Sequence, residues 1–196
     1  MSDHQGVPVR ALPVAEGLLL RPFEEADLPA LIEAHRDETL RHFTRRPVDD
    51  AESASRWLAR QREGWAAGSR YSYAVLDAAV PDTAGAELLG NVALKCGPLP
   101  SVAEVGYWTA APARGRGVAP RAVEVLTAWA FETFAASGLE RIDLLHQVDN
   151  EASCRVAEKC GYRFEEVLSA LPPDYPLDGH RHARKRLDAP QHRRPE

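Results

Sequence analysis

The spacing of apolar residues changes several times along the chain, and each change marks a new element. The stretch EGLLLRPF, residues 16–23, is a short apolar run closed by a proline, which predicts a strand. Apolar residues then recur at helical spacing in EEADLPALIEAHR and in DDAESASRWLARQREGWAAG, the second of which begins at an aspartate cap and ends at Gly68. We therefore expect a strand followed by two helices.

Residues 70–110 follow a different pattern. RYSYAVLD (70–77), ELLGNVALKCG (87–97) and VAEVGYWTA (102–110) are rich in β-branched or aromatic residues and are separated by turn residues, which predicts three antiparallel strands. Helical spacing returns at Val118 and ends near Gly138. A strand (139–148), a short helix (150–161), a strand (162–168) and a last strand (180–187) complete the predicted order.

This order predicts one mixed α/β domain, because a strand–helix–strand unit needs a crossover whereas the preceding meander does not. The chain has 196 residues, 44% of them hydrophobic and 27% charged, which is typical of a globular domain. The domain is expected to span residues 15–187. The proline-containing segments 1–14 and 188–196 are expected to be tails.

Charge and cysteine content narrow the function classes. The formal net charge is −5, so no general basic field is available to hold a nucleic-acid backbone. Three cysteines without CxxC spacing argue against a disulfide framework. No apolar run approaches the ~18 residues of a membrane span, and the N-terminus lacks the pattern of a signal peptide. We expect a cytoplasmic protein that binds neither nucleic acid nor membrane.

No metal site is expected from the sequence. His180 and His182 share one face of a predicted strand, but neither a carboxylate nor a cysteine completes a ligand set with them. Cys154 and Cys160 are interpreted as small core residues rather than nucleophiles, because no activating histidine is adjacent.

The stretch APARGRGVAP carries the strongest chemical signal. Pro120 is tolerated only in the first turn of a helix, so residues 115–119 lie at a helix N-terminus. Unpaired N–H groups there bind anions, glycine lets a phosphate approach the backbone, and Arg114 and Arg116 add charge, which favours a diphosphate. The pattern matches neither a P-loop nor a Rossmann fingerprint. An arginine-rich turn without a ligand and an RNA-binding loop stay open as alternatives.

The surroundings of this stretch resemble the GNAT superfamily of acetyl-coenzyme A-dependent acyltransferases, in particular its RimJ/RimL-type branch of ribosomal-protein N-terminal acetyltransferases. Two motifs, joined by a helix and a strand, carry the resemblance. The first is met by Arg114, Gly117 and Ala119, and the second by Asn150, Ser153, Gly161 and Tyr162. The branch commonly has Thr-Glu where this chain has Pro120 and Arg121.

The resemblance implies a mostly antiparallel sheet of about seven strands, splayed at a site for acetyl-coenzyme A. The pantetheine arm would pair with Trp108, Thr109 and Ala110, and Asn150 would cap its helix and contact the same arm. The backbone of Arg114, Gly115, Arg116, Gly117, Val118 and Ala119 would hold the pyrophosphate. Arg155 would meet the adenosine phosphate or would simply be solvated.

The acceptor amine must be neutral to attack a thioester. Deprotonating a lysine ε-amine, with a pKa of about 10.4, costs about 4 kcal/mol at pH 7, whereas deprotonating an α-amine, with a pKa of about 7.7, costs about 1 kcal/mol. By resemblance, Glu104 is the candidate base acting through water, and backbone N–H groups near Trp108 would stabilise the oxyanion. Many family members protonate the leaving thiolate with a tyrosine at the position of Ala157, so Ser153 is the candidate donor here. For Glu104, the alternative is a solvated carboxylate at the rim of the site. For Ser153, it is an ordinary serine near the start of a helix.

The acceptor pocket is expected to involve His35, His42, Phe43 and Trp57, because the segment that carries them is the variable substrate side of the family. We expect an N-acetyltransferase acting on a primary amine, foremost the N-terminal α-amine of a protein or peptide. A small-molecule amine, such as an antibiotic or a polyamine, is the alternative acceptor, and a non-catalytic acyl-coenzyme A sensor is the alternative class. A homodimer is left open.

Overall fold

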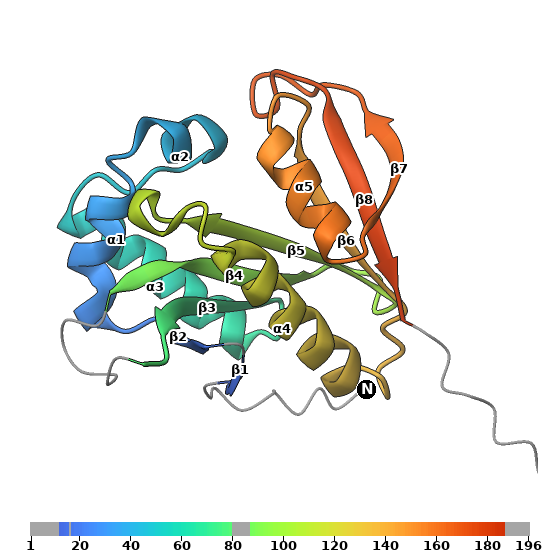
Figure 1. Ribbon diagram of the computed structural model, residues 1–196, viewed down its shortest axis with the longest axis horizontal. Helices are drawn as coiled ribbons and strands as arrows, with labels where there is room; N and C mark the ends of the chain where they lie inside the picture. The colour runs from blue at the N-terminus through green and yellow to red at the C-terminus, as the bar shows by residue number, and fades with distance from the viewer. Residues whose placement is uncertain (1–11, 16, 80–86, 187–196) are drawn as a thin grey trace, which may run out of the picture.

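The computed structural model describes residues 12–15, 17–79 and 87–186, and Figure 1 shows their arrangement. The strands are β1 (Leu12–Ala15), β2 (Leu18–Pro22), β3 (Arg70–Asp77), β4 (Leu88–Cys96), β5 (Val102–Thr109), β6 (Arg141–Gln147), β7 (Arg163–Leu168) and β8 (Gly179–Lys185). The helices are α1 (Leu28–Ala34), α2 (Glu38–Phe43), α3 (Ala51–Ala66), α4 (Val118–Thr133) and α5 (Glu151–Lys159). Within the described ranges, no helix is long and apolar enough to cross a bilayer.

The strands form a single mixed sheet, which confirms the predicted fold class. Its order is β1-β2-β3-β4-β5-β6-β8-β7, and every pair is antiparallel except β5 and β6. The sheet has eight strands rather than about seven, because Leu12 is buried and pairs with Leu20. Residues 12–14, expected to belong to a tail, therefore begin the sheet. The rest of both predicted tails lies outside the described residues.

Helices cover the sheet on both faces (Figure 1). Alternation along β3 divides the core: Tyr73 and Val75 pack with α4, whereas Ala74 and Leu76 pack with α1 and α3. Helix α5 lies on the same face as α4 and contacts it. The long helix α4 is thus fixed against the centre of the sheet, with its N-terminus held near the end of β5.

The sheet opens between its two central strands. The parallel pairing of β5 with β6 begins at Val102 and ends at Val105 opposite Leu144, although β5 continues to Thr109 and β6 to Gln147. Figure 1 shows the two strands diverging beyond this point. We call this divergence the splay; it confirms the expectation taken from the family resemblance.

Two features of the fold were not part of the sequence-based prediction. The helix predicted from EEADLPALIEAHR is α1, which ends at Ala34. A further short helix, α2, follows it, because the Asp37 side chain accepts the Leu40 N–H to start it. The last strand, β8, inserts between β6 and β7. The order of elements along the chain does not determine which strand pairs with which, so this insertion was not predictable from the apolar pattern.

Candidate active site

The turn before α4 has the geometry of an anion site. Gly117 is the N-cap residue with φ of 71°, and Gly115 has φ of 73°, both in the left-handed region that favours glycine. A Cβ added at either glycine would meet nothing within 4 Å, so the turn is open to a ligand. Pro120 lies in the first helical turn, as expected, and the Arg121 N–H closes that turn on the Gly117 carbonyl at 3.4 Å. The N–H groups ahead of it have no intrahelical acceptor.

Arginine side chains surround this turn. Arg114 forms an ion pair with Asp37, and its hydrogen bond lowers the pKa of that carboxyl below the ordinary value. Arg116 lies 3.9 Å from the Asp77 carboxylate. Arg121 folds back over the turn, where its Nε donates to the Gly117 carbonyl at 3.2 Å. The chain is acidic overall, so this cluster concentrates positive charge where the helix dipole is also positive.

The end of β5 offers a free edge at the splay. Thr109 pairs with Gly90 and Trp108 with Asn91 on the β4 side, and the Ala110 N–H donates to the Leu89 carbonyl at 2.9 Å. A Cβ at Gly90 would overlap the Trp108 carbonyl oxygen, so only glycine allows β4 to follow β5 this closely. On the side away from β4, this segment is no longer paired with β6. An extended, amide-bearing ligand can therefore pair with its backbone there as an added strand would.

Helix α5 brings a hydroxyl to the far side of the splay. Asn150 caps α5, as expected, by accepting the Ser153 N–H at 3.1 Å. Ser153 is 8% exposed, and its Oγ accepts a hydrogen bond of 2.9 Å from the Tyr107 hydroxyl of β5. Burial raises the pKa of Tyr107 to about 12, so this phenol stays protonated. Sequence reasoning missed Tyr107, although alternation along β5 places it on the helix-facing side with Val105.

Glu104 is ion-paired. It faces Lys95 across the β4–β5 register, and the Lys95 Nζ contacts its carboxylate. It also lies on the part of β5 that is still paired with β6, opposite Asp143. Trp108, four residues further along, shares its face of the sheet at the start of the splay. The role of Glu104 as a base stays a prediction.

The segment carrying α1 and α2 touches both arms of the splay. His35 is 2% exposed and packs edge-on against Trp108 of β5, with ring centroids 5.5 Å apart. His42 Nε2 lies 2.8 Å from Asp149 Oδ2 in the turn after β6, and its ring contacts Phe43. Trp57 packs edge-on against Phe23 at 4.7 Å, in the core cluster that also receives Trp108. Three of the four predicted acceptor residues therefore gather at the splay, and Trp57 lies in the adjoining core.

The remaining predicted positions have simpler surroundings. Arg155 is exposed and faces Glu151 of its own helix at 3.6 Å. Cys160 is a core residue, as interpreted, and burial raises the pKa of its thiol to about 11.

The premise that no histidine adjoins Cys154 is wrong, because its Sγ lies 3.5 Å from His146 Nε2 and 3.4 Å from His180 Nδ1. The fold brings these residues together from β6, α5 and β8, which local sequence cannot show.

Comparison with known proteins agrees with this geometry. Residues 17–163 match the acetyltransferase (GNAT) domain family. An acetyltransferase from Salmonella typhimurium that modifies the N-terminal serine of ribosomal protein L7/L12 superposes with a TM-score of 0.74 at 20% identity, covering 91% of this chain and 100% of that one. RimL, a ribosomal L7/L12 α-N-protein acetyltransferase in complex with coenzyme A, gives 0.72 at 20% identity, with 90% and 98% covered.

A third solved structure is the microcin C7 self-immunity acetyltransferase MccE in complex with acetyl-coenzyme A and AMP, with a TM-score of 0.76, 16% identity, and 93% and 99% of the two chains covered. A search of curated proteins found no significant match. The family match covers most of the chain, including the turn before α4, the splay and Ser153. The protein belongs to the GNAT family of acetyltransferases.

Proposed function

We propose that the protein transfers the acetyl group of acetyl-coenzyme A to a primary amine, and that its acceptor is the α-amine at the N-terminus of a protein or peptide. The observation that carries the first part is the open, glycine-lined turn at the N-terminus of α4, which lies beside the free edge of β5. A coenzyme needs both features, one for its pyrophosphate and one for its amide-bearing arm.

The turn would bind the pyrophosphate through the amides of residues 115–119. Arg116 and Arg121 lie at this turn, and Arg114 is held there by Asp37. The arm would then run along Trp108–Ala110, which directs the thioester toward Ser153. The coenzyme complexes of RimL and MccE support this assignment by analogy of fold.

The Tyr107–Ser153 pair supports a route for the leaving group. Because the Tyr107 hydroxyl donates to the Ser153 Oγ, the hydrogen of Ser153 is free to point elsewhere. When the amine attacks the thioester and the tetrahedral intermediate collapses, Ser153 donates a hydrogen bond to the departing thiolate sulfur. The proton lost by the attacking amine goes to water and, by our prediction, onward to Glu104.

The α-amine is favoured by the modest base that the site offers. The candidate base, Glu104, is a carboxylate that is already ion-paired with Lys95, so it offers only modest help in removing a proton through water. An α-amine with a pKa of about 7.7 needs little more than this at neutral pH, whereas a lysine ε-amine costs about 4 kcal/mol to deprotonate. The Salmonella neighbour, which modifies an N-terminal serine, supports the same choice. A small-molecule amine remains the second candidate, on the likeness to the MccE self-immunity enzyme.

The test is release of free thiol from acetyl-coenzyme A in the presence of an amine panel. The panel contains peptides with free N-termini, the same peptides with blocked N-termini, polyamines and aminoglycosides. We expect turnover with free peptides and its loss when the N-terminus is blocked. Turnover confined to small amines would replace the proposed acceptor, and thermal stabilisation by the coenzyme without thiol release from any amine would identify a sensor.

A further inference from the structure

A cluster of three histidines and one cysteine lies between α5 and the sheet, outside the features assigned to acetyl transfer. Within the described part of the chain, one ligand atom from each of His146, Cys154, His180 and His182 lies within 4.8 Å of every other. The residues come from three elements, because His146 is on β6, Cys154 on α5, and both remaining histidines on β8. We refer to them as the His₃Cys cluster.

The distances to sulfur already fit a tetrahedral metal centre. Zinc binds thiolate sulfur at about 2.3 Å and imidazole nitrogen at about 2.0–2.1 Å, which places sulfur and nitrogen about 3.5 Å apart on the edge of a tetrahedron. Cys154 Sγ lies 3.5 Å from His146 Nε2 and 3.4 Å from His180 Nδ1. All four ligand atoms lie within 4.8 Å of one another, so binding would require the histidine side chains to move closer together.

The tautomer of His146 is suited to metal binding. Its Nδ1 lies 2.8 Å from the Gln147 carbonyl oxygen, so Nδ1 carries the hydrogen and donates it to that carbonyl. Nε2 is then left with its lone pair, and this is the atom that faces the Cys154 sulfur. A backbone carbonyl that orients a histidine in this way is the usual support of a metal ligand.

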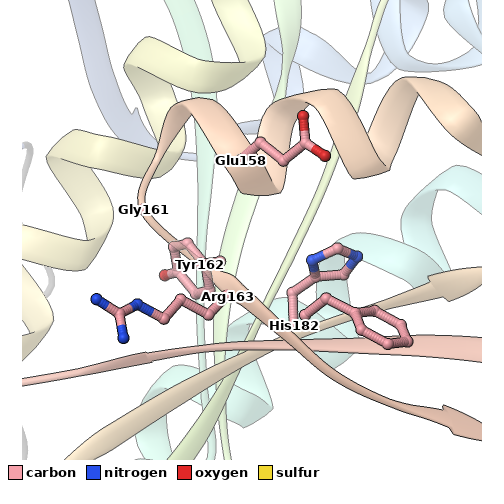
Figure 2. Close-up of a pocket in the computed structure, with 6 residues that line it drawn as sticks. Glu158, Gly161, Tyr162, Arg163 and His182 are labelled. Atoms are coloured by element: carbon pink, nitrogen blue, oxygen red, sulfur yellow. The ribbon is translucent and has the colours of Figure 1, made fainter.

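His182 supplies an independent indication. Its side chain is 3% exposed, and neither ring nitrogen has a hydrogen-bond partner of good geometry, which is costly for a buried polar group. Figure 2 shows its imidazole pointing from β8 toward α5, with Glu158 on that helix. A hollow of about 500 Å³ is lined in part by His182, Glu158 and Phe164, so it adjoins the cluster at His182.

The charges around the cluster also suit a cation. The carboxylates of Glu158 and Glu151, on the same helix, lie near the Cys154 thiol. Binding would exchange the thiol proton for the metal, and the two carboxylates would offset the positive charge of a divalent ion with one thiolate.

We propose that the His₃Cys cluster binds one Zn²⁺ ion in a closed tetrahedral site that fastens α5 to β6 and β8. Imidazole and thiolate together select zinc among the common divalent ions. Four protein ligands leave no position for water or substrate, so the ion is structural. The sequence-based expectation of no metal rested on the absence of a cysteine to join His180 and His182, and the fold supplies Cys154.

The test is zinc binding by the full chain, produced without a polyhistidine tag and freed of metal with a chelator. Titration against a chromophoric zinc chelator measures affinity, and Co²⁺ replacement reports geometry through its visible absorption. We expect one ion per chain and the spectrum of tetrahedral cobalt with a thiolate ligand. Removing a residue that only hydrogen-bonds to a metal ligand typically lowers metal affinity about 10–100-fold. Loss of a ligand in Cys154→Ser or His182→Gln should therefore weaken binding at least about 100-fold.

Cys96→Ser is the matched control, because Cys96 is a half-buried free thiol on β4 outside the cluster. It should bind zinc as the unchanged chain does. Should a variant fail to fold, alkylation of the unchanged chain decides the question, since Zn²⁺ should protect Cys154 and leave Cys96 reactive. Equal affinity in Cys154→Ser, an octahedral cobalt spectrum, or equal alkylation of Cys154 with and without zinc would overturn the proposal.

Discussion

The Tyr107 hydroxyl of β5 donates a 2.9 Å hydrogen bond to the Ser153 Oγ of α5, and so joins the two sides of the splay. Because β5 and β6 are no longer paired at this point, the contact passes across the opening in which the thioester is expected. The pair gives Ser153 a fixed orientation.

Replacing Ser153 by alanine should lower kcat by about 10–100-fold with little change in coenzyme affinity, because the hydroxyl acts on the departing sulfur and not on the pyrophosphate. Tyr107→Phe should lower kcat by up to about tenfold, since it removes only the partner that orients Ser153. Tyr162→Phe is the control. It deletes a buried hydroxyl bonded to Thr127 at 2.6 Å, and should cost stability while sparing kcat. Equal kcat in all three variants would exclude this route for the leaving group.

Replacing Gly117 by valine should weaken coenzyme binding by at least about tenfold. The side chain would occupy the open turn, and the left-handed φ of 71° would strain any such residue. Gly138→Val is matched for strain, because Gly138 has φ of 85° and the same free space but lies beyond the C-terminal end of α4. Calorimetric titration with coenzyme A should separate the two variants. Similar losses in both would show that strain, and not the turn, is responsible.

Glu104→Gln should reduce kcat/KM for a peptide amine at pH 7, and the reduction should shrink as the pH rises above the pKa of the α-amine, because a neutral amine needs no base. Rates between pH 6.5 and 9 measure this. The substitution also breaks the contact with Lys95, so Lys95→Met serves as the control for that loss. A constant ratio of rates across the pH range would identify Glu104 as a solvated rim carboxylate.

The pH dependence of folding should reflect His35. Burial lowers its pKa below the ordinary histidine value of 6.5, so the unfolded chain binds a proton that the folded chain resists. The stability associated with neutral His35 is therefore complete above pH 6.5 and declines as the pH falls below that value. His35→Leu should flatten the fall in Tm between pH 7.5 and 5.5, measured with chelator present so that metal binding does not contribute. An unchanged slope would show that His35 is not an important titrating group.

Local sequence was sufficient for most elements. Strand β3 matches its predicted range of residues 70–77, and α4 begins at Val118 as the position of Pro120 required. Both signals are short-range, since one depends on residue type in a continuous run and the other on a missing backbone N–H. The short helix α2 was not predicted, because its start depends on one side-chain cap at Asp37.

The site was less predictable, because its most informative contacts join distant segments. The turn at Gly115 and Gly117 and the cap at Asn150 follow from neighbouring residues. The Tyr107–Ser153 bond depends on α5 packing against β5, and the contact between Cys154 and His180 depends on α5 packing against β8. No pattern within one segment encodes such a contact, so a correct fold class still left the partners of Ser153 and Cys154 unidentified.

The proposed reaction is tested most directly by locating the acetyl group on one peptide that has both a free N-terminus and a lysine. The peptide is incubated with the protein and acetyl-coenzyme A, and fragment-ion mass spectrometry assigns the modified nitrogen. We predict a single acetyl group on the α-amine, lost with Gly117→Val and retained with Gly138→Val. Acetylation of the lysine instead, or an unmodified peptide across a range of N-terminal residues, would contradict the assignment.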